Sequence, residues 1–155
     1  MKEFMKKRLN LLLVVLVLFS SCEIMAQEKV TVSTGADIVS GYYWRGQNLG
    51  GVSIQPTISV AKKGFSLTAW GSVGIDKEDT KELDFTAGYT VGNLSLAVTD
   101  YYFSPTKYFN YASHSTSHLY EATIGYNFGP MALSWNTNFA GNDYYKKDGK
   151  RAYST

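Results

Sequence analysis

A two-residue alternation of apolar and polar side chains runs along most of the chain and limits what it can fold into. In the stretch GADIVSGYYWRGQNLGG, one set of alternate residues is Ala36, Ile38, Ser40, Tyr42 and Trp44. The set between them includes Asp37 and Arg45. This period is that of a β-strand, whose successive side chains point to opposite faces, and not that of an α-helix. The fold therefore depends on which of the two faces meets water.

The same alternation predicts seven strands in an antiparallel meander, without a helical period after residue 26. They are expected at about residues 30–44, 52–60, 65–75, 82–91, 94–99, 120–128 and 131–139, with the start of an eighth at 151–155. Short turns at 62–64, 92–93 and 129–130 alternate with longer connections at 47–51, 77–81 and 104–118. Transmembrane β-barrels of the outer membrane have this asymmetry, with short periplasmic turns and longer extracellular loops.

The composition of the polar face favours a membrane barrel over a soluble one. A soluble protein usually exposes many Lys, Glu, Arg and Asp, whereas the mid-strand polar residues here are mainly Ser, Thr, Gly, Asn and Gln. Aromatic residues gather toward strand ends, as at a lipid–water interface: Tyr42, Trp44, Phe65, Tyr102, Tyr126, Phe128 and Phe139. We therefore expect Ile38, Tyr42 and Trp44 to face lipid. A soluble exported β-barrel that binds a small ligand is the alternative.

Strict alternation leaves one misfit, because it places Asp100 on the lipid face. We expect the strand to end near Thr99, or a bulge to shift its register.

The N-terminus predicts export. MKEFMKKR is basic, LNLLLVVLVLF is apolar and small residues follow, as in a secretory signal peptide. Cleavage is expected after Ala26, leaving residues 27–155, and the alternative is lipidation of Cys22. Residues 1–26 contain four of the 15 Lys and Arg and two of the 13 Asp and Glu, so the remainder has no net charge. A net charge of zero does not favour the binding of nucleic acid. Cleavage after Ala26 would also remove the single cysteine, Cys22, so the mature protein would have no disulfides.

The expected strands do not complete a barrel. Single-chain bacterial barrels close with an even number of strands, and an open sheet would leave unpaired backbone groups in lipid. The expected fold is an all-β, antiparallel up-and-down transmembrane β-barrel. About seven to eight of its strands are present, so residues 27–155 form a partial outer-membrane β-barrel, the N-terminal fragment of a longer one.

Four short motifs resemble landmarks of one bacterial family. They are Tyr43-Trp44-Arg45-Gly46, AWGS at 69–72, LDFTAGYT at 83–90 and Asp100-Tyr101-Tyr102-Phe103. Over about residues 30–145 the chain resembles the TorF family of Gram-negative outer-membrane proteins. The resemblance implies an outer-membrane barrel with a loosely assigned porin function and no established substrate. MAQE at the cleavage point also resembles signal-peptide endings of the Bacteroides group.

The charged residues of the polar face are the candidates for a lumen site. They are Asp37, Arg45, Glu82, Asp84 and Glu121. They form either an ion-pair network filling a narrow barrel or a charged constriction that selects solutes. Asp37 and Arg45 are roughly 26 Å apart along a strand that rises about 3.3 Å per residue, so we expect Arg45 to pair with Glu82 or Asp84. Trp70 on the same face either plugs the lumen or stacks against a sugar.

The longest connection, 104–118, contains three aromatic residues: Tyr108, Phe109 and Tyr111. They form either a patch that binds a sugar or partner, or ordinary packing over the barrel mouth. His114 and His118 lie in the same loop without a third ligand, so we expect both to be solvated and predict no metal site and no cofactor. No Ser–His–acid set is expected on facing strands, so we predict no catalytic residues and no enzymatic activity.

The chain is therefore expected to contact outer-membrane lipid and to belong to a porin that passively admits small solutes. A non-conducting barrel that anchors surface-binding loops is the other interpretation. Total strand number separates them, because eight strands leave a filled interior and about twelve or more leave room for a channel.

Overall fold

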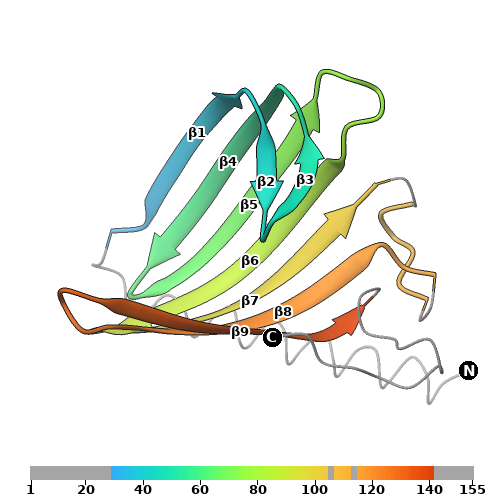
Figure 1. The fold of residues 1–155 in the computed structure, drawn as a ribbon. Coiled ribbons are helices and arrows are strands. Elements are labelled where there is room, and N and C mark those ends of the chain that lie inside the picture. The colour runs from blue at the N-terminus through green and yellow to red at the C-terminus, as the bar shows by residue number, and fades with distance from the viewer. Residues whose placement is uncertain (1–28, 105–106, 113–114, 142–155) are drawn as a thin grey trace, which may run out of the picture.

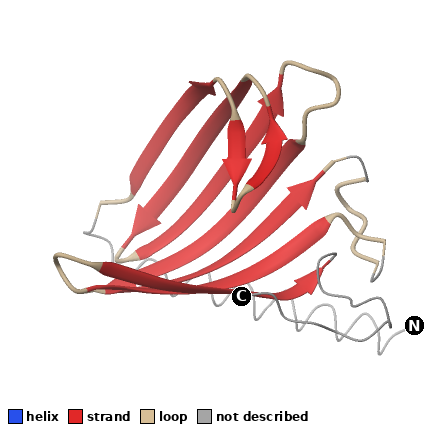
Figure 2. Cartoon of the chain, viewed as in Figure 1, coloured by secondary structure: helices blue, strands red, loops and turns tan. Residues whose placement is uncertain are grey.

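The computed structural model describes residues 29–104, 107–112 and 115–141, which form β-structure and loops (Figure 2). The signal peptide expected at 1–26, with Cys22, lies outside the described residues, as do His114 and the expected strand at 151–155. Within the described ranges no helix is long and apolar enough to cross a membrane.

Seven strands form one antiparallel sheet in the order β1-β4-β5-β6-β7-β8-β9, and β2 and β3 form a separate hairpin (Figure 1). The bounds are β1 Thr31–Val39, β2 Tyr42–Trp44, β3 Gln47–Gly50, β4 Ser53–Lys62, β5 Phe65–Gly74, β6 Lys81–Val91, β7 Leu94–Phe103, β8 His118–Asn127 and β9 Ala132–Gly141. The predicted seven-stranded meander is confirmed. The sheet is not closed into a barrel, and β1 and β9 are its two edges.

The first expected strand, at residues 30–44, is wrong in its second half. β1 ends at Val39, and the next residues form the hairpin β2–β3 around Arg45 and Gly46, both with positive φ (47° and 80°). β1 pairs with β4 along its whole length, so the hairpin is inserted in the connection between two neighbouring strands. The break falls at Ser40 and Gly41, two small residues that the expected strand includes.

Short and long connections alternate as expected. The turns after β4, β6 and β8 are short and lie at one end of the sheet, whereas residues 40–52, 75–80 and 104–117 connect strands at the other end (Figure 1). Gly64 shows why a turn this tight needs glycine. Its φ is +83°, and a Cβ placed there would collide with the carbonyl oxygen of Thr90.

The two faces of the sheet differ in chemistry. We call the side with Gln55, Ser72, Asp84, Tyr101 and Glu121 the polar face, and the side with Ile58, Leu67, Phe85, Val98 and Ile124 the apolar face. The sheet curls so that the hairpin lies inside the curve (Figure 1), against the polar face.

Burial is inverted relative to a water-soluble domain. Leu119 is the one buried hydrophobic residue among those described. The buried polar residues are Ser53, Gln55, Ser72, Glu82, Asp84, Thr99, Thr116, Ser117, His118, Glu121 and Asn138. Large side chains of the apolar face remain exposed, such as Ile38 at 78% and Leu67 at 66%. Soluble domains bury large hydrophobic side chains and leave most polar ones in water.

Candidate functional site

Aromatic side chains hold one strand of the hairpin on the polar face. The hydroxyl of Tyr42 donates to Oε2 of Glu82 at 2.7 Å, and the ring centroids of Tyr42 and Trp70 are 5.6 Å apart. The ring of Trp44 lies 5.6 Å from that of Tyr101. The expectation that Tyr42 and Trp44 face lipid is therefore wrong. The chain turns after β1, so the alternation of β1 no longer determines where these two side chains point.

Arg45, at the hairpin turn, adds an ion pair with β8. Its Nη1 lies 2.6 Å from Oε2 of Glu121, and its guanidinium stands 4.3 Å from the centroid of the Trp44 ring. The hydroxyl of Tyr101 donates to the other oxygen of Glu121 at 3.2 Å. The adjacent Glu121 carboxylate raises the pKa of the guanidinium. The pair thus joins the hairpin turn to a carboxylate buried on the sheet.

The expected pairing of Arg45 with Glu82 or Asp84 is wrong, because the hairpin moves Arg45 across the sheet to β8. Glu82 and Asp84 are buried next to each other on β6, and in the described part of the chain neither forms an ion pair. Glu82 accepts the hydroxyl of Tyr42, whereas Oδ1 of Asp84 has no hydrogen-bond partner there. Two carboxylates so placed make this part of the polar face strongly acidic when ionised.

The structure gathers five of the six expected lumen residues around the hairpin: Arg45, Trp70, Glu82, Asp84 and Glu121. Asp37 lies apart on the edge strand β1, exposed and in register with Gln55. Sequence reasoning missed Tyr101, because it ended the strand near Thr99. Continuing the alternation through Phe103 would have placed Tyr101 on the polar face.

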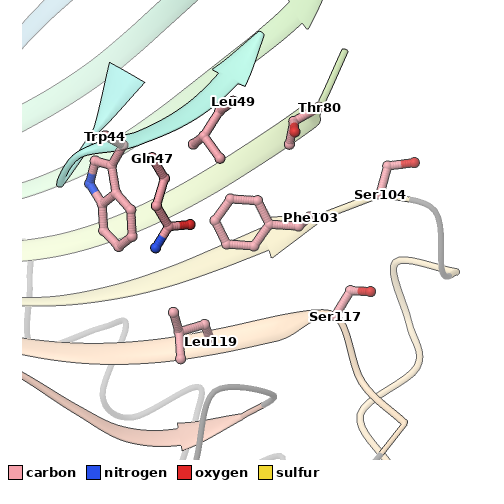
Figure 3. A pocket seen from close by; sticks show the side chains of 8 residues that line it. All are labelled: Trp44, Gln47, Leu49, Thr80, Phe103, Ser104, Ser117 and Leu119. Carbon is pink, nitrogen blue, oxygen red and sulfur yellow. The ribbon is translucent and has the colours of Figure 1, made fainter. Parts of the chain in front are cut away.

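A cavity of about 350 Å³ lies between the hairpin and the ends of β6, β7 and β8 (Figure 3). From the hairpin, Trp44, Gln47 and Leu49 point toward Phe103 and Leu119 on the sheet (Figure 3). Thr80, Ser104 and Ser117 complete its wall where the long connections meet the strands. This cavity could not be predicted from the alternation, because it exists only once the hairpin folds inward.

The apolar face carries an acid–base pair near the same end of the sheet. Nδ1 of His118 lies 2.7 Å from Oδ1 of Asp100, and Nε2 lies 2.5 Å from the backbone oxygen of Tyr108. Each ring nitrogen of His118 therefore has an oxygen partner, one from the neighbouring strand and one from the loop. The rings of Tyr102, Tyr108, Tyr111 and Tyr120 surround His118, with centroids 4.5–6.2 Å away.

Two expectations about this region are wrong. His118 is not solvated but fully buried, at 0% exposure, and begins β8. The strand does not end near Thr99, nor does a bulge shift its register there: β7 continues to Phe103, and Asp100 stays on the apolar face opposite Phe85. The pairing with His118 satisfies the carboxylate on that face.

The loop aromatics pack on this acid–base pair rather than over the mouth of the sheet. Tyr108 contacts Phe85 and Tyr102, and Tyr111 stacks on His118. Phe109 packs edge-on against Tyr108 and is otherwise exposed, at 83%. Desolvation raises the pKa of the Tyr108 hydroxyl to about 12, with a further contribution from Tyr111. Tyr108 therefore stays neutral at physiological pH.

No family model, no curated protein and no solved structure matches this chain. The resemblance to the TorF family accordingly stays a prediction. In the ranges that the structure describes, no cluster of three or more His, Cys, Asp or Glu is placed to hold a metal ion.

Proposed function

We propose that the chain forms part of an outer-membrane β-barrel that passively admits small solutes past an inward-folded hairpin. The observation that supports this proposal most is the inverted burial: nearly all the buried side chains are polar, and the large side chains of the apolar face are exposed. A monomeric soluble protein rarely exposes a contiguous apolar patch larger than a few hundred Å². In a bilayer the same face meets hydrocarbon, and the polar face lines a lumen.

Aromatic residues on the apolar face support the membrane assignment. Tyr120 and Tyr126 are six residues apart on β8, roughly 20 Å at about 3.3 Å per residue. This span is close to the roughly 25 Å apolar band that aromatic girdles flank in outer-membrane barrels. At the turn end Tyr126 packs on Phe128 and Phe65 packs on Tyr89, with ring centroids 4.6 and 4.4 Å apart. The aromatic rings therefore lie at two levels, one near each end of the strands.

The open edges of the sheet support the proposal that the barrel needs further strands. β1 and β9 do not pair with each other, and unpaired backbone groups in hydrocarbon cost several kcal/mol each. We propose that these strands come from a longer protein of which residues 27–155 are the N-terminal part, after export and removal of a signal peptide. A second copy of the chain pairing along the same edges is the other arrangement.

In this proposal the hairpin sets the width of the lumen. The ion pair of Arg45 with Glu121 and the hydrogen bond of Tyr42 to Glu82 fix it over the sheet. The solute path then runs past charged and hydroxyl-bearing side chains. The same contacts also favour the second candidate, a non-conducting barrel whose hairpin blocks the lumen and whose loops bind at the surface. We propose no catalytic role, since Nε2 of His118 is bonded to a backbone oxygen and not to a nucleophile.

Removing the hairpin separates the two candidates. Val39 pairs with Ser53, so replacing residues 40–52 by Asn-Gly gives a two-residue hairpin turn that preserves the pairing of β1 with β4. The full-length natural protein should be recovered in the outer membrane and should conduct in planar bilayers, and the shortened variant should conduct more. Shortening residues 107–112, in the long connection that packs on the apolar face, opposite to the hairpin, is the matched control. Recovery as a stable soluble protein would refute the proposed location, and conductance only in the shortened variant would favour the blocked barrel.

A further inference from the structure

We propose that the cavity beneath the hairpin is a binding site for a neutral sugar. The proposal deepens the proposed function and rests on it in one respect, because it takes the polar face as the solute side of the protein. The cavity's volume of about 350 Å³ lies at the lower end of the roughly 300–1,000 Å³ of small-molecule sites.

The apolar part of the cavity offers a flat aromatic platform. The rings of Trp44 and Phe103 face the space from opposite walls, with Leu49 and Leu119 beside them (Figure 3). Arg45 covers part of the Trp44 ring and Tyr101 packs against it, so the indole is held in place with its remaining surface toward the cavity. A pyranose presents a face of C–H groups, which suits such a ring, and an edge of hydroxyl groups.

The polar part of the cavity offers hydrogen-bonding groups to the hydroxyl groups of a sugar. Gln47 supplies an amide and Thr80 a hydroxyl, and Ser104 and Ser117 line the outer end of the cavity with their hydroxyls directed away from Trp44 (Figure 3). Each of these groups can both donate and accept a hydrogen bond, as each hydroxyl of a sugar can. An apolar ligand would leave them unpaired on binding, which costs about 1–3 kcal/mol for each group that becomes buried.

The charge distribution favours a neutral ligand over an ion. Among the described residues that line the cavity, none is charged. The nearest cation along the hairpin, Arg45, is already paired with Glu121. The wall positions are also fixed by the backbone, because the amide of Phe103 donates to the oxygen of Ser117 at 3.1 Å and the amide of Ser104 to that of Lys81 at 2.9 Å. The hydroxyls therefore belong to an ordered wall rather than to a free loop.

Titration calorimetry on the full-length protein in detergent tests this site directly. The probes are methyl β-glucoside as the neutral sugar, and citrate and putrescine as charged compounds. We expect saturable binding of the glucoside alone. Trp44→Leu should weaken it at least about tenfold, and Gln47→Met and Thr80→Val, which preserve shape, should each weaken it about 3- to 10-fold. Trp135→Leu, on the apolar face of β9, should leave the affinity unchanged.

Conductance measured on the same preparations keeps the two proposals apart. Glucoside binding by a protein that does not conduct would support this site and refute the passive pore. Conductance without glucoside binding would overturn the sugar site alone. Binding of citrate or putrescine instead of the glucoside, or equal glucoside affinity in folded Gln47→Met, Thr80→Val and wild-type protein, would also overturn it.

Discussion

The ion pair between Arg45 and Glu121 gives the most quantitative prediction. Oε2 of Glu121 lies 2.6 Å from Nη1 of Arg45, and the Glu121 side chain is 3% exposed. Its other oxygen accepts a hydrogen bond from Tyr101 at 3.2 Å. Arg45→Ala would therefore leave a buried carboxylate with one neutral hydrogen-bond donor among the described residues.

The loss of stability expected for Arg45→Ala depends on how deeply the two partners of the ion pair are buried. Removing one partner of a fully buried pair costs about 3–5 kcal/mol, but the Arg45 side chain is 42% exposed, so water replaces part of what is lost. We expect Arg45→Ala to lower the free energy of unfolding by about 1.5–3 kcal/mol. Glu121→Gln in the same chain removes the stranded charge, so the double variant should be more stable than Arg45→Ala alone.

Urea unfolding of the full-length protein in lipid vesicles measures these differences. A double-mutant cycle should give a coupling energy of about 1–2 kcal/mol between the two positions. In planar bilayers Arg45→Ala should also shift ion preference toward cations, because Glu121 loses its counter-charge. Strictly additive effects of the two substitutions would refute the pairing, and with it the placement of the hairpin turn over β8.

Two further predictions concern the apolar face. His118→Ala removes the imidazole that contacts the backbone oxygen of Tyr108 and holds the loop on this face. Protease should therefore cut within residues 104–117 on intact cells at least several times faster than in wild type, and an unchanged rate would contradict the anchoring role. Val98→Lys should cost about 2–4 kcal/mol, the typical cost of a cation on the lipid face of a barrel near the midplane, whereas Ala97→Lys, one residue away on the polar face, should cost little. Equal unfolding midpoints for these two variants in vesicles would contradict the assignment of the faces.

The meander could be predicted from sequence because its determinants are local. Alternation fixes which residues of a strand share a face, and glycine-containing turns such as Lys63-Gly64 mark where the chain reverses. Neither signal depends on distant parts of the chain. The strand order, the alternation of short and long connections and the chemistry of the two faces followed from these signals alone.

The candidate site could be predicted only in part, because it depends on a reversal that the alternation hides. Ser40 and Gly41 are small residues that fit either face of a strand, so β1 and the first strand of the hairpin are expected as one strand. Once the hairpin folds inward, Tyr42 and Trp44 exchange a lipid environment for a polar one, and Arg45 reaches β8 instead of β6. Glu82, Asp84 and Glu121 needed no such reversal, and their assignment to the polar face was correct.

The contact between Asp100 and His118 on the apolar face was also not predicted, and the reason is different. Asp100 breaks the alternation of β7, and this break suggests a strand end or a bulge. In the structure the carboxylate of Asp100 contacts His118, the first residue of the neighbouring strand β8. A one-dimensional pattern contains no information on which cross-strand neighbour pairs with a carboxylate on the apolar face.

The central claim is that the apolar face meets lipid and the polar face meets water, and one labelling experiment tests it directly. Residues 27–155 contain no cysteine, so Val98→Cys or Ala97→Cys, in a full-length protein without other reactive cysteines, gives a single site for a fluorophore. In vesicles of the full-length protein, brominated lipid should quench the label at position 98, and aqueous iodide should quench the label at position 97. Iodide quenching at both positions, without quenching by brominated lipid at either, would contradict the account.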